Sequence, residues 1–525
     1  MKTDSKQSYN DRNPLVVIAS NRGPFSFTRD DDGEYSVERG SGGLVTALGA
    51  LAEQHEVVWV ACAMQPDDRQ WQADWQAEHP DEVAQVEGIY LTLVTPDQTS
   101  YDQYYGEISN PLLWFIQHQM WDIPRHPSIT RETRQAWTEG YLEINREFAE
   151  AIAESVKQTL ADGERPIIVL VQDYHLYMVP KYLREIVGDT IQVQHFLHIP
   201  WPGPDVWRIL PKDMRNALLD SMLLADRLGF QTKRDAFNFV QTCRFYLEGA
   251  HSRGSRDSIH YQGRKIKAHA YPISIDIKKV DQLAQEGETQ LYKSQILNII
   301  GDRKLILRVD RIEPSKNMIR GLKAFQALLE DHPEHVGRVS MVALLVPSRM
   351  EVGEYQDYWR DVMAEAGFIN SQFSDGLWEP VRILVGNNYP RALAAMQLYD
   401  VLLVNPIADG MNLVAKEGAL LNQRDGVIIL SEDAGAYYEL GEQTLTVSPF
   451  DVDGMAQAMH SGLTMSQDER HERSAALKEI VRSADVREWF YAQVQDALTA
   501  STNQDSSDST SETPVTKKSA SSRTA

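Results

Sequence analysis

Short apolar runs alternate with longer amphipathic segments along most of the 525 residues. The runs are continuous and rich in β-branched residues, which is typical of parallel strands covered on both faces. A longer segment, 134–160, has apolar positions near helical spacing and is predicted to be a connecting helix. In the first half of the chain we predict strands at 15–19, 57–62, 89–94, 167–171 and 192–197. Strands that alternate with helices predict βαβ units in a doubly wound sheet.

The same alternation restarts in the second half, where strands are predicted at 304–309, 339–345, 381–385, 401–405 and 427–430. The predicted fold class is therefore α/β, with two Rossmann-like doubly wound domains that face each other across a cleft. We expect a flexible N-terminus (1–13), a first domain (14–276), a second domain (277–485), a closing amphipathic helix (486–500) and a disordered tail (501–525). The tail is rich in Ser, Thr, Asp and Lys and cannot bury an apolar core.

Composition narrows the class of protein. A net charge of −23 argues against nucleic-acid binding and against an anionic membrane surface, although basic residues can still gather in a cleft. The two cysteines, Cys62 and Cys243, are expected to be buried free thiols. The N-terminus has no secretory pattern and no apolar stretch is long enough to span a bilayer, so we expect a cytoplasmic protein.

Glycines and a basic residue follow the first predicted strand. Arg22 comes directly after it, and a Gly-Ser-Gly-Gly loop that includes Gly43 leads into a helix. Such loops let backbone amides approach a phosphate, although an ordinary flexible loop is an equal alternative. Between them, Asp31 to Gly33 predict a hairpin turn rather than a metal-binding motif. No His, Cys or Asp cluster stands at metal-ligand spacing, so no metal site is predicted.

Four further groups of polar residues follow predicted strands, where open α/β sheets bind ligands. Asp173 and His198 each end a strand of the first half, with a helix N-cap and a structural histidine as the alternatives. Arg311 and Lys316 could clamp a diphosphate, or form a solvated charge run. Asp409 precedes a glycine turn into a helix that carries Glu417, so amides and two carboxylates could meet a nucleotide sugar there.

Taken together, these motifs resemble the trehalose-6-phosphate synthase family of retaining glycosyltransferases, from about Leu15 to Leu498. The resemblance is carried by Ser-Asn-Arg at 20–22, Asp-Tyr-His-Leu at 173–176, His-Ile-Pro at 198–200, Pro-Ser-Arg at 347–349 and Asp-Gly-Met-Asn-Leu-Val-Ala-Lys-Glu at 409–417. The family fold is GT-B, with two Rossmann-like domains. The family activity implies glucosyl transfer from a nucleotide-glucose donor to glucose 6-phosphate, which gives trehalose 6-phosphate.

The resemblance also implies roles for residues. The acceptor side would comprise Arg22, Tyr105, Trp114, Asp173 and Arg349. The donor side would comprise Gly43, Arg311, Lys316, Asp409, Gly410, Met411, Asn412, Leu413, Val414 and Glu417. His198, Arg311, Lys316 and Asp409 would carry the chemistry, without a cofactor or metal. The first domain would then bind the acceptor and the second the nucleotide sugar.

The chain departs from the family at three places: Ala408 replaces a frequent arginine, the clamp contains Ile-Glu-Pro, and 25–39 lengthens the first loop. The acceptor therefore stays open, with a glucosylglycerol-phosphate synthase as the nearest alternative. A non-catalytic nucleotide-sugar-binding regulator is the alternative of another class, and a dehydrogenase lacks its glycine fingerprint. UDP-glucose is the preferred donor, with GDP- and ADP-glucose open. A homo-oligomer is open too, and a separate phosphatase is expected to act on the product.

Overall fold

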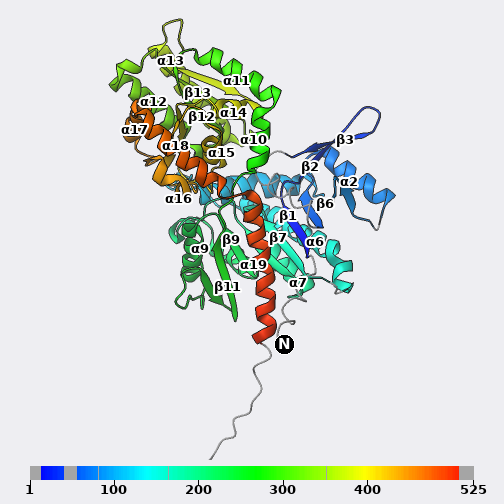
Figure 1. The fold of residues 1–525 in the computed structure, drawn as a ribbon. Helices are drawn as coiled ribbons and strands as arrows, with labels where there is room; N and C mark the ends of the chain where they lie inside the picture. Colours follow the sequence, from blue (N-terminus) through cyan, green and yellow to red (C-terminus); the bar gives the residue numbers. More distant parts are fainter. Residues whose placement is uncertain (1–13, 41–55, 81, 163–164, 351, 508–525) are drawn as a thin grey trace, which may run out of the picture.

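Two α/β modules make up the protein, each built on a mainly parallel sheet (Figure 1). The computed structural model describes residues 14–40, 56–80, 82–162, 165–350 and 352–507. We call the elements from β1 to β11 the first module and those from α10 to α18 the second module. This arrangement confirms the predicted fold class.

The first module contains a nine-stranded sheet in the order β10-β11-β9-β8-β7-β1-β4-β6-β5. The chain runs outward from β1 through β4 to β6, then returns to the other side through β7, β8, β9 and β11. All these neighbours pair in parallel, and only β5 and β10 add antiparallel edges among the described strands. The strands are β1 (Leu15–Ser20), β4 (Val57–Cys62), β5 (Ala84–Val86), β6 (Ile89–Val94), β7 (Ile167–Gln172), β8 (Gln192–Phe196), β9 (Arg227–Phe230), β10 (Ser258–Tyr261) and β11 (Arg264–Ala270).

Alternate side chains of the central strands enter two different apolar cores. Leu15, Val17 and Ala19 of β1 pack on one face of the sheet, and Val16 and Ile18 on the other. Both faces are covered by helices, which explains the uninterrupted apolar runs. The helices of this module are α2 (Pro66–Glu78), α3 (Gln98–Tyr101), η1 (Asp102–Trp114), α4 (Phe115–Gln117), α5 (Arg131–Gln135), η2 (Ala136–Leu142), α6 (Glu143–Asp162), η3 (Tyr174–Leu176), α7 (Val179–Val187), η4 (Pro204–Ile209), α8 (Lys212–Met222) and α9 (Lys233–Tyr246).

The second module contains a six-stranded sheet in the order β14-β13-β12-β15-β16-β17, parallel throughout. In chain order this is the 3-2-1-4-5-6 arrangement of nucleotide-binding folds, whose direction reverses between β12 and β15. The strands are β12 (Lys304–Arg311), β13 (Val339–Val346), β14 (Val381–Val385), β15 (Val401–Val404), β16 (Val427–Ser431) and β17 (Leu445–Val447). The helices are α10 (Ile277–Gln285), α11 (Gly287–Ile300), η5 (Pro314–Lys316), α12 (Met318–Asp331), η6 (Pro333–His335), α13 (Gly353–Phe373), α14 (Tyr389–Met396), α15 (Leu413–Leu421), α16 (Tyr437–Leu440), η7 (Gly441–Gln443), α17 (Val452–Thr464) and α18 (Gln467–Arg482).

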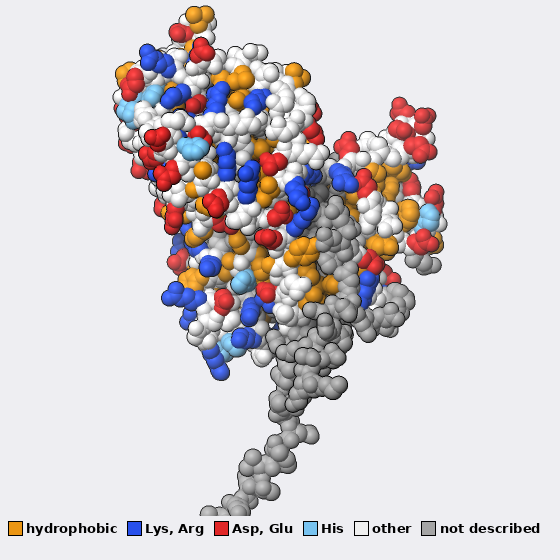
Figure 2. All heavy atoms as spheres, in the orientation of Figure 1, with side chains coloured by type: hydrophobic (Ala, Val, Ile, Leu, Met, Phe, Trp, Pro, Cys, Tyr) orange, Lys and Arg blue, Asp and Glu red, His pale blue; other side chains and the backbone are white. Residues whose placement is uncertain are grey.

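The predicted hairpin is present as β2 (Phe25–Arg29) and β3 (Tyr35–Arg39). In its turn, one carboxylate oxygen of Asp30 accepts hydrogen bonds from the backbone amides of Asp32 and Glu34. Acidic side chains gather at the projecting tip of this hairpin (Figure 2). The extra residues 25–39 therefore form an extension of the first module.

The helix predicted at 134–160 is divided. It begins in α5, passes through the π-helix η2 and continues as α6. The extra residue that a π-turn accommodates brings Gly140 directly against the neighbouring π-helix η1, where a Cβ would lie 2.6 Å from the Cβ of Gln103. A periodicity count does not detect such a change of winding.

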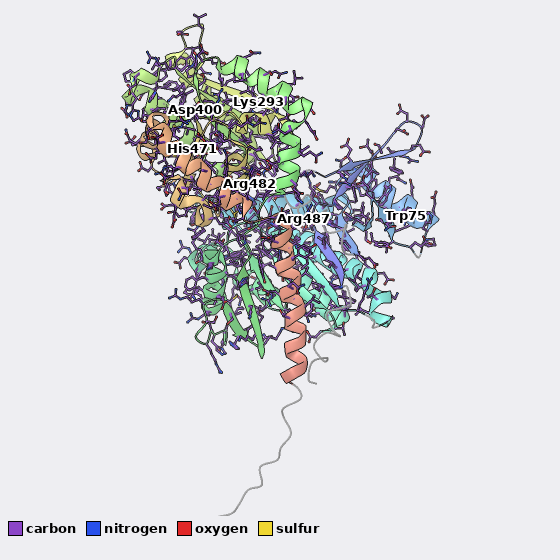
Figure 3. The ribbon with its side chains drawn as sticks, in the orientation of Figure 1. Trp75, Lys293, Asp400, His471, Arg482 and Arg487 are labelled. Atoms are coloured by element: carbon purple, nitrogen blue, oxygen red, sulfur yellow. The ribbon has the colours of Figure 1, made fainter. Side chains whose placement is uncertain are left out.

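The last helix, α19 (Val486–Ser507), leaves the second module and lies along the first (Figures 1 and 3). Arg482 and Arg487 mark the passage from α18 to α19 in Figure 3. Gln493 on α19 accepts a hydrogen bond from Gln194 on β8, 2.6 Å away, and Asp496 pairs with Arg227 on β9 at 3.0 Å. The helix continues to Ser507, so it does not end at 500 as predicted, and residues 508–525 lie outside the described part of the chain.

Candidate active site

The predicted site residues lie at the carboxyl ends of the parallel strands in both modules. In the first module they follow the strands on either side of the reversal point between β1 and β7, and in the second those between β12 and β15. Loops diverge at such points and leave a crevice for a ligand. The residues concerned are Arg22 after β1, Asp173 after β7, His198 after β8, Arg311 and Lys316 at and after β12, and Asp409 after β15.

A glycine allows the carboxyl edges of the two sheets to approach each other closely. Gly410, between β15 and α15, packs so closely on the first module that a Cβ there would lie 1.7 Å from the carbonyl oxygen of His198. No side chain fits in that space, so glycine is required for this approach. The Asp409–Gly410 turn and the His198 loop therefore face each other across the site.

Lys316 and Asp409, both predicted donor-side residues, form a buried ion pair. The Lys316 Nζ lies 2.5 Å from the Asp409 Oδ2, which also accepts a hydrogen bond from the Asn412 side-chain amide at 3.0 Å. Burial is the largest single effect and acts against the charged form of each, but the attraction within the pair, together with neighbouring charges and hydrogen bonds, outweighs it. Together these interactions raise the pKa of Lys316 and lower the pKa of Asp409. A lysine cation and a carboxylate are thus held charged at the N-terminal end of α15.

Glu313 lies between two of the predicted arginines. Its Oε1 is 3.3 Å from the Arg311 Nε and 3.5 Å from the Arg349 Nη1, and it accepts a hydrogen bond from the Ser348 hydroxyl at 3.1 Å. The carboxylate is fully buried, which by itself would raise its pKa, yet Arg311, Arg349 and Lys316 lower the pKa to about 2. One anion therefore holds Arg311, which is predicted for the donor side, beside Arg349, which is predicted for the acceptor side.

Arg349 connects the second module to an aromatic cluster of the first. Its backbone has a φ of 47°, an uncommon value for arginine, and its guanidinium lies 4.9 Å from the Trp114 ring centroid. Its Nη2 donates to the Tyr174 hydroxyl at 3.2 Å, and its Nη1 to the Tyr355 hydroxyl at 2.5 Å. The structure thus brings the predicted residues Arg349 and Trp114 together.

The two predicted aromatics, Tyr105 and Trp114, both lie in the π-helix η1. Trp114 is buried and stacks on His118 with ring centroids 3.9 Å apart. Tyr105 stacks on His175, the neighbour of Tyr174, at 5.9 Å. Of the two rings, that of Trp114 faces the Arg349 guanidinium.

Asp173 has a strained backbone, and the pKa of its carboxyl group is raised. Its φ of 68° with ψ of 178° belongs to a region that is nearly exclusive to glycine, and such strain concentrates at functional sites. The Asp173 Oδ1 accepts a hydrogen bond from the His198 amide at 3.2 Å. Burial raises the pKa of Asp173 to about 7, against the opposing effect of that hydrogen bond and of Arg349 and Arg311.

His198 is held as a neutral imidazole. Its Nε2 donates to the Gln172 Oε1 at 2.9 Å, which leaves Nδ1 to accept from the Gln231 side-chain amide at 3.4 Å. Burial, with a smaller effect of His195, lowers the pKa of His198 to about 3. The ring therefore bears no charge at neutral pH and offers hydrogen bonds only.

The segment from Gly410 to Val414 forms the turn and the first residues of α15, as predicted for a nucleotide-sugar site. Asn412 caps the helix from a left-handed conformation, φ 72°, and its side chain accepts from the Ala415 amide at 3.2 Å. Met411 is buried, while Leu413 and Val414 are partly exposed. Amides at the helix N-terminus suit an anion.

Farther along α15, Glu417 accepts a hydrogen bond from the Tyr389 hydroxyl at 2.8 Å, and burial raises the pKa of Glu417 to about 7.

Two predicted residues are not joined to this group. Arg22 is exposed after β1, and it forms no ion pair with any other residue that the structure describes. Gly43 lies outside the described residues.

Several residues that complete the site were not predicted. Glu313 and Tyr174 stand inside motifs that were recognised, so their positions beside Arg311 and Asp173 were an available signal. Tyr355 comes from α13 and His118 from the end of α4, and nothing in the sequence pattern points to them. Tyr355 reaches the site because α13 of the second module packs against the first, whereas His118 belongs to the first module and stacks on Trp114.

Two Rossmann-type modules that face each other through the carboxyl edges of their sheets, with a cationic group of side chains between them, define a glycosyltransferase of the GT-B type. The sequence model of glycosyltransferase family 20 matches residues 14–499, and the chain belongs to this family.

Known proteins resemble the whole chain. The trehalose-6-phosphate synthase of Mycolicibacterium gilvum is 34% identical over 486 residues, which cover 90% of this chain and 91% of the relative. A structure from E. coli bound with UDP-2-fluoro glucose is 28% identical with a TM-score of 0.78, covering 92% of this chain and 99% of that chain. A UDP-forming α,α-trehalose-phosphate synthase from Burkholderia xenovorans, in complex with glucose-6-phosphate, is 27% identical with a TM-score of 0.76 and covers 92% and 99% of the two chains. None of the described helices is long and apolar enough to cross a membrane.

Proposed function

We propose that the protein transfers glucose from UDP-glucose to glucose 6-phosphate with retention, giving α,α-trehalose 6-phosphate and UDP. The names and bound ligands of the similar proteins support this choice of donor, acceptor and product. The observation in the molecule that carries the proposal is the group Arg311–Glu313–Arg349, which sets two guanidiniums side by side at the junction of the modules. Two such groups suit two phosphorylated substrates.

On the donor side, Arg311, Lys316 and the amides at the start of α15 stabilise the diphosphate as it leaves. Asp409, held by Lys316 and Asn412, accepts hydrogen bonds from the hydroxyls of the transferred glucose. Glu417 meets the ribose. In this assignment, residues 277–485 form the nucleotide-sugar domain.

On the acceptor side, Arg349 and Arg22 hold the phosphate of glucose 6-phosphate, and Tyr105 and Trp114 line the sugar. Asp173 accepts a hydrogen bond from an acceptor hydroxyl, and the neutral His198 lies beside the donor glucose. Residues 14–276 form this acceptor-side domain. Because His198 keeps its proton on Nε2 for Gln172, it positions rather than accepts a proton.

In the transfer step, the bond between the anomeric carbon and the diphosphate oxygen breaks as the acceptor hydroxyl oxygen bonds to that carbon from the same face. The hydroxyl proton passes to an oxygen of the departing diphosphate. The protein supplies charge stabilisation and orientation, which account for a large part of the rate in such sites.

A matrix of donors and acceptors tests the proposal. UDP-, GDP- and ADP-glucose are each incubated with glucose 6-phosphate, glycerol 3-phosphate and glucose, and nucleotide release and product mass are measured. UDP-glucose with glucose 6-phosphate should give the highest kcat/KM and a disaccharide phosphate. A faster reaction with glycerol 3-phosphate would show that glucose 6-phosphate is not the preferred acceptor. A faster reaction with GDP- or ADP-glucose would show that UDP-glucose is not the preferred donor. No nucleotide release with any pair would contradict transferase activity.

A further inference from the structure

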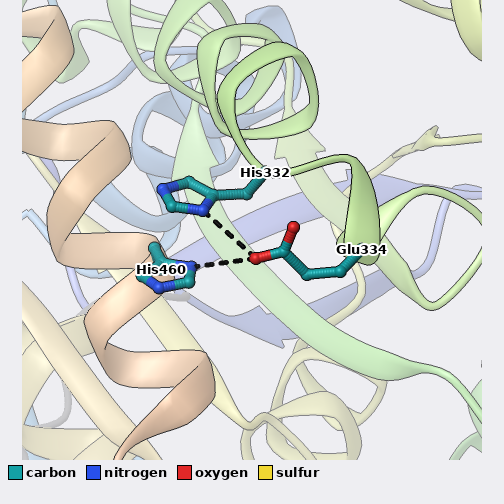
Figure 4. Close-up of side chains that lie close together, drawn as sticks. All are labelled: His332, Glu334 and His460. Carbon is teal, nitrogen blue, oxygen red and sulfur yellow. Dashed lines mark hydrogen bonds and ion pairs between the residues drawn. The ribbon is translucent and has the colours of Figure 1, made fainter.

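Three histidines and a glutamate gather at the edge of the second sheet opposite the candidate active site. His332 follows α12, Glu334 and His335 belong to η6, and His460 comes from the last turns of α17. Figure 4 shows His332, Glu334 and His460 close together. The segment η6 precedes β13, and the Lys304 ammonium at the start of β12 binds the Leu463 carbonyl near the end of α17. The group therefore lies at the amino ends of the strands, whereas Arg311 lies at the carboxyl end of β12.

The sequence predicts no metal site, because no His, Cys or Asp cluster stands at metal-ligand spacing along the chain, but the structure brings this group together in space. Only the His332-Pro333-Glu334-His335 segment is local, and its spacing alone is not a metal motif. The fourth member, His460, joins because α17 packs beside α12.

The possible ligand atoms are separated by distances close to those of a metal site. The His332 Nδ1 lies 3.2 Å from the Glu334 Oε1, which is 4.0 Å from the His460 Nδ1. The same His460 Nδ1 is 3.1 Å from the Nε2 of His335. Ligands of a tetrahedral zinc ion, each bonded at 2.0–2.1 Å, are about 3.3 Å apart. The ligand atoms of His332, Glu334 and His460 lie within 4.8 Å of one another, the His335 Nε2 adjoins the His460 Nδ1, and surrounding one ion requires these side chains to move.

The required movements are rotations of exposed rings. The rings of His332 and His460 are stacked, with centroids 3.6 Å apart and planes at 12°, whereas a nitrogen binds a metal in the plane of its ring. Both rings must therefore turn about their Cβ–Cγ bonds. The side chains of His332 and His460 are 22% and 26% exposed and that of Glu334 is 54% exposed, so solvent leaves room for this turn. His335 is buried and provides a fixed point.

We propose that His332, Glu334 and His460, with His335 as the fourth ligand, bind one zinc ion. Imidazole and carboxylate are ordinary zinc ligands, and four protein ligands close the coordination shell, as in structural rather than catalytic sites. The ion joins the α12–η6 segment to α17 and stabilises the second module by binding the folded state alone.

Zinc titration of the metal-free full chain, purified without a histidine tag, tests the proposal. A competing chromophoric chelator measures affinity and stoichiometry, and the melting temperature is followed in parallel. The wild type should bind one zinc ion per chain and melt at a higher temperature with zinc. His460→Ala should bind at least tenfold more weakly and lose the zinc-dependent shift.

The matched control is His471→Ala. His471 is exposed and has one carboxylate partner, Asp425, with Nδ1 and Oδ2 3.2 Å apart, and Figure 3 shows it on α18. This variant should bind zinc as the wild type does. The proposal is wrong if the wild type binds no zinc, or if His460→Ala binds as tightly as His471→Ala.

If His460→Ala does not fold, a second variant tests the proposal. Glu334→Gln keeps the size of an exposed side chain, so it should fold normally and still bind zinc at least tenfold more weakly. Unchanged affinity in that variant contradicts the proposal. Since the cluster is remote from the active site, zinc should leave nucleotide release unchanged, and these binding measurements do not depend on the proposed reaction.

Discussion

Glu313 holds a pair of cations that would otherwise repel each other. Glu313→Gln keeps the shape of the side chain and its bond to Ser348, but it leaves Arg311 and Arg349 without their shared anion. Removing one member of a buried charge group is strongly destabilising for those that remain. We expect kcat/KM to fall at least about tenfold for donor and acceptor alike, because both arginines move.

Steady-state kinetics with each substrate varied in turn check this effect, and Glu313→Asp, which retains the charge, serves as the control. The Asp variant should keep more activity than the Gln variant. Wild-type KM values for both substrates in Glu313→Gln would show that the carboxylate does not position the arginines.

We expect Arg349 to contribute to the binding of glucose 6-phosphate and not to that of the donor. Its guanidinium is held by Tyr174 and Tyr355 beside Trp114, on the acceptor side. We expect Arg349→Ala to raise the KM for glucose 6-phosphate more than about tenfold, since a bidentate phosphate contact is lost, and to change UDP binding little. Kinetics and calorimetric binding of UDP measure the two effects. Tyr355→Phe, which removes only a hydroxyl, should show a smaller change, and weaker UDP binding in Arg349→Ala would contradict the assignment.

Asp173 should make acceptor binding depend on pH. Its pKa is raised to about 7 by burial, so the carboxylate is increasingly protonated as the pH falls from 8 to about 6. A protonated carboxyl accepts a hydrogen bond from a sugar hydroxyl less strongly than a carboxylate does. The KM for glucose 6-phosphate should therefore rise over that range. The substrate phosphate itself titrates near about pH 6. Asp173→Asn should retain only that second dependence, and identical pH profiles for the two proteins would exclude the role of Asp173.

At the scale of elements, most of the strands that were predicted are buried on both faces, and the partly exposed β14 is an exception. Continuous runs such as 57–62 and 401–405 correspond to β4 and β15, because helices cover both sides of them. β11 was missed because its exposure alternates beside the antiparallel edge strand β10. β9 was missed because it contains Arg227 and Gly229, and Gly229 leaves space for Phe196.

The site residues also fall into those that the sequence pattern predicts and those that it does not. Residues directly after strands, such as Asp173 and Asp409, were predictable because the carboxyl ends of parallel strands share one edge. Tyr355 and His460 were not, since Tyr355 meets Trp114 and His460 meets His335 only through packing between distant segments. Local patterns do not record such contacts.

The turn between β15 and α15 permits a test of the contact between modules. In Gly410→Ala the new methyl group meets the His198 backbone, so the turn and α15 must move. A shift of about 1 Å at a reacting centre can cost about a hundredfold in rate, and we expect at least a tenfold loss of kcat. Gly367→Ala in α13, where a Cβ meets open space, is the control and should keep wild-type kcat. Normal kcat in Gly410→Ala would show that the close approach is not needed.

At the scale of the whole molecule, the chain crosses between the modules at two adjacent places. One crossing is 271–276, before α10, and the other is 483–486, before α19. The amide of Val486 donates to the Ile275 carbonyl at 3.3 Å, and the Trp489 indole donates to the Tyr271 carbonyl at 3.0 Å. Two crossings in contact define a single hinge about which the modules can close on their substrates.

The helix after the second crossing should be needed for a stable first module. A chain that ends at Asp485 lacks α19 and exposes the apolar surface around Phe196 and Tyr271. We expect its melting temperature to fall by more than about 5 °C, measured by calorimetry, because several buried side chains of α19 are lost. A chain that ends at Ser507 is the control and should melt as the full chain does. Equal stability of the two truncations would show that α19 is dispensable.

The position of α19 also affects how the protein is made on the ribosome. The strands of the first module are complete once Ala270 has been synthesised, but the helix that covers part of their sheet is encoded at the far end of the chain. At about 5–20 residues per second, the second module takes on the order of ten seconds or more to synthesise. During that time the nascent first module carries an uncovered apolar face. The last of the described helices to leave the ribosome thus completes the first domain to begin folding.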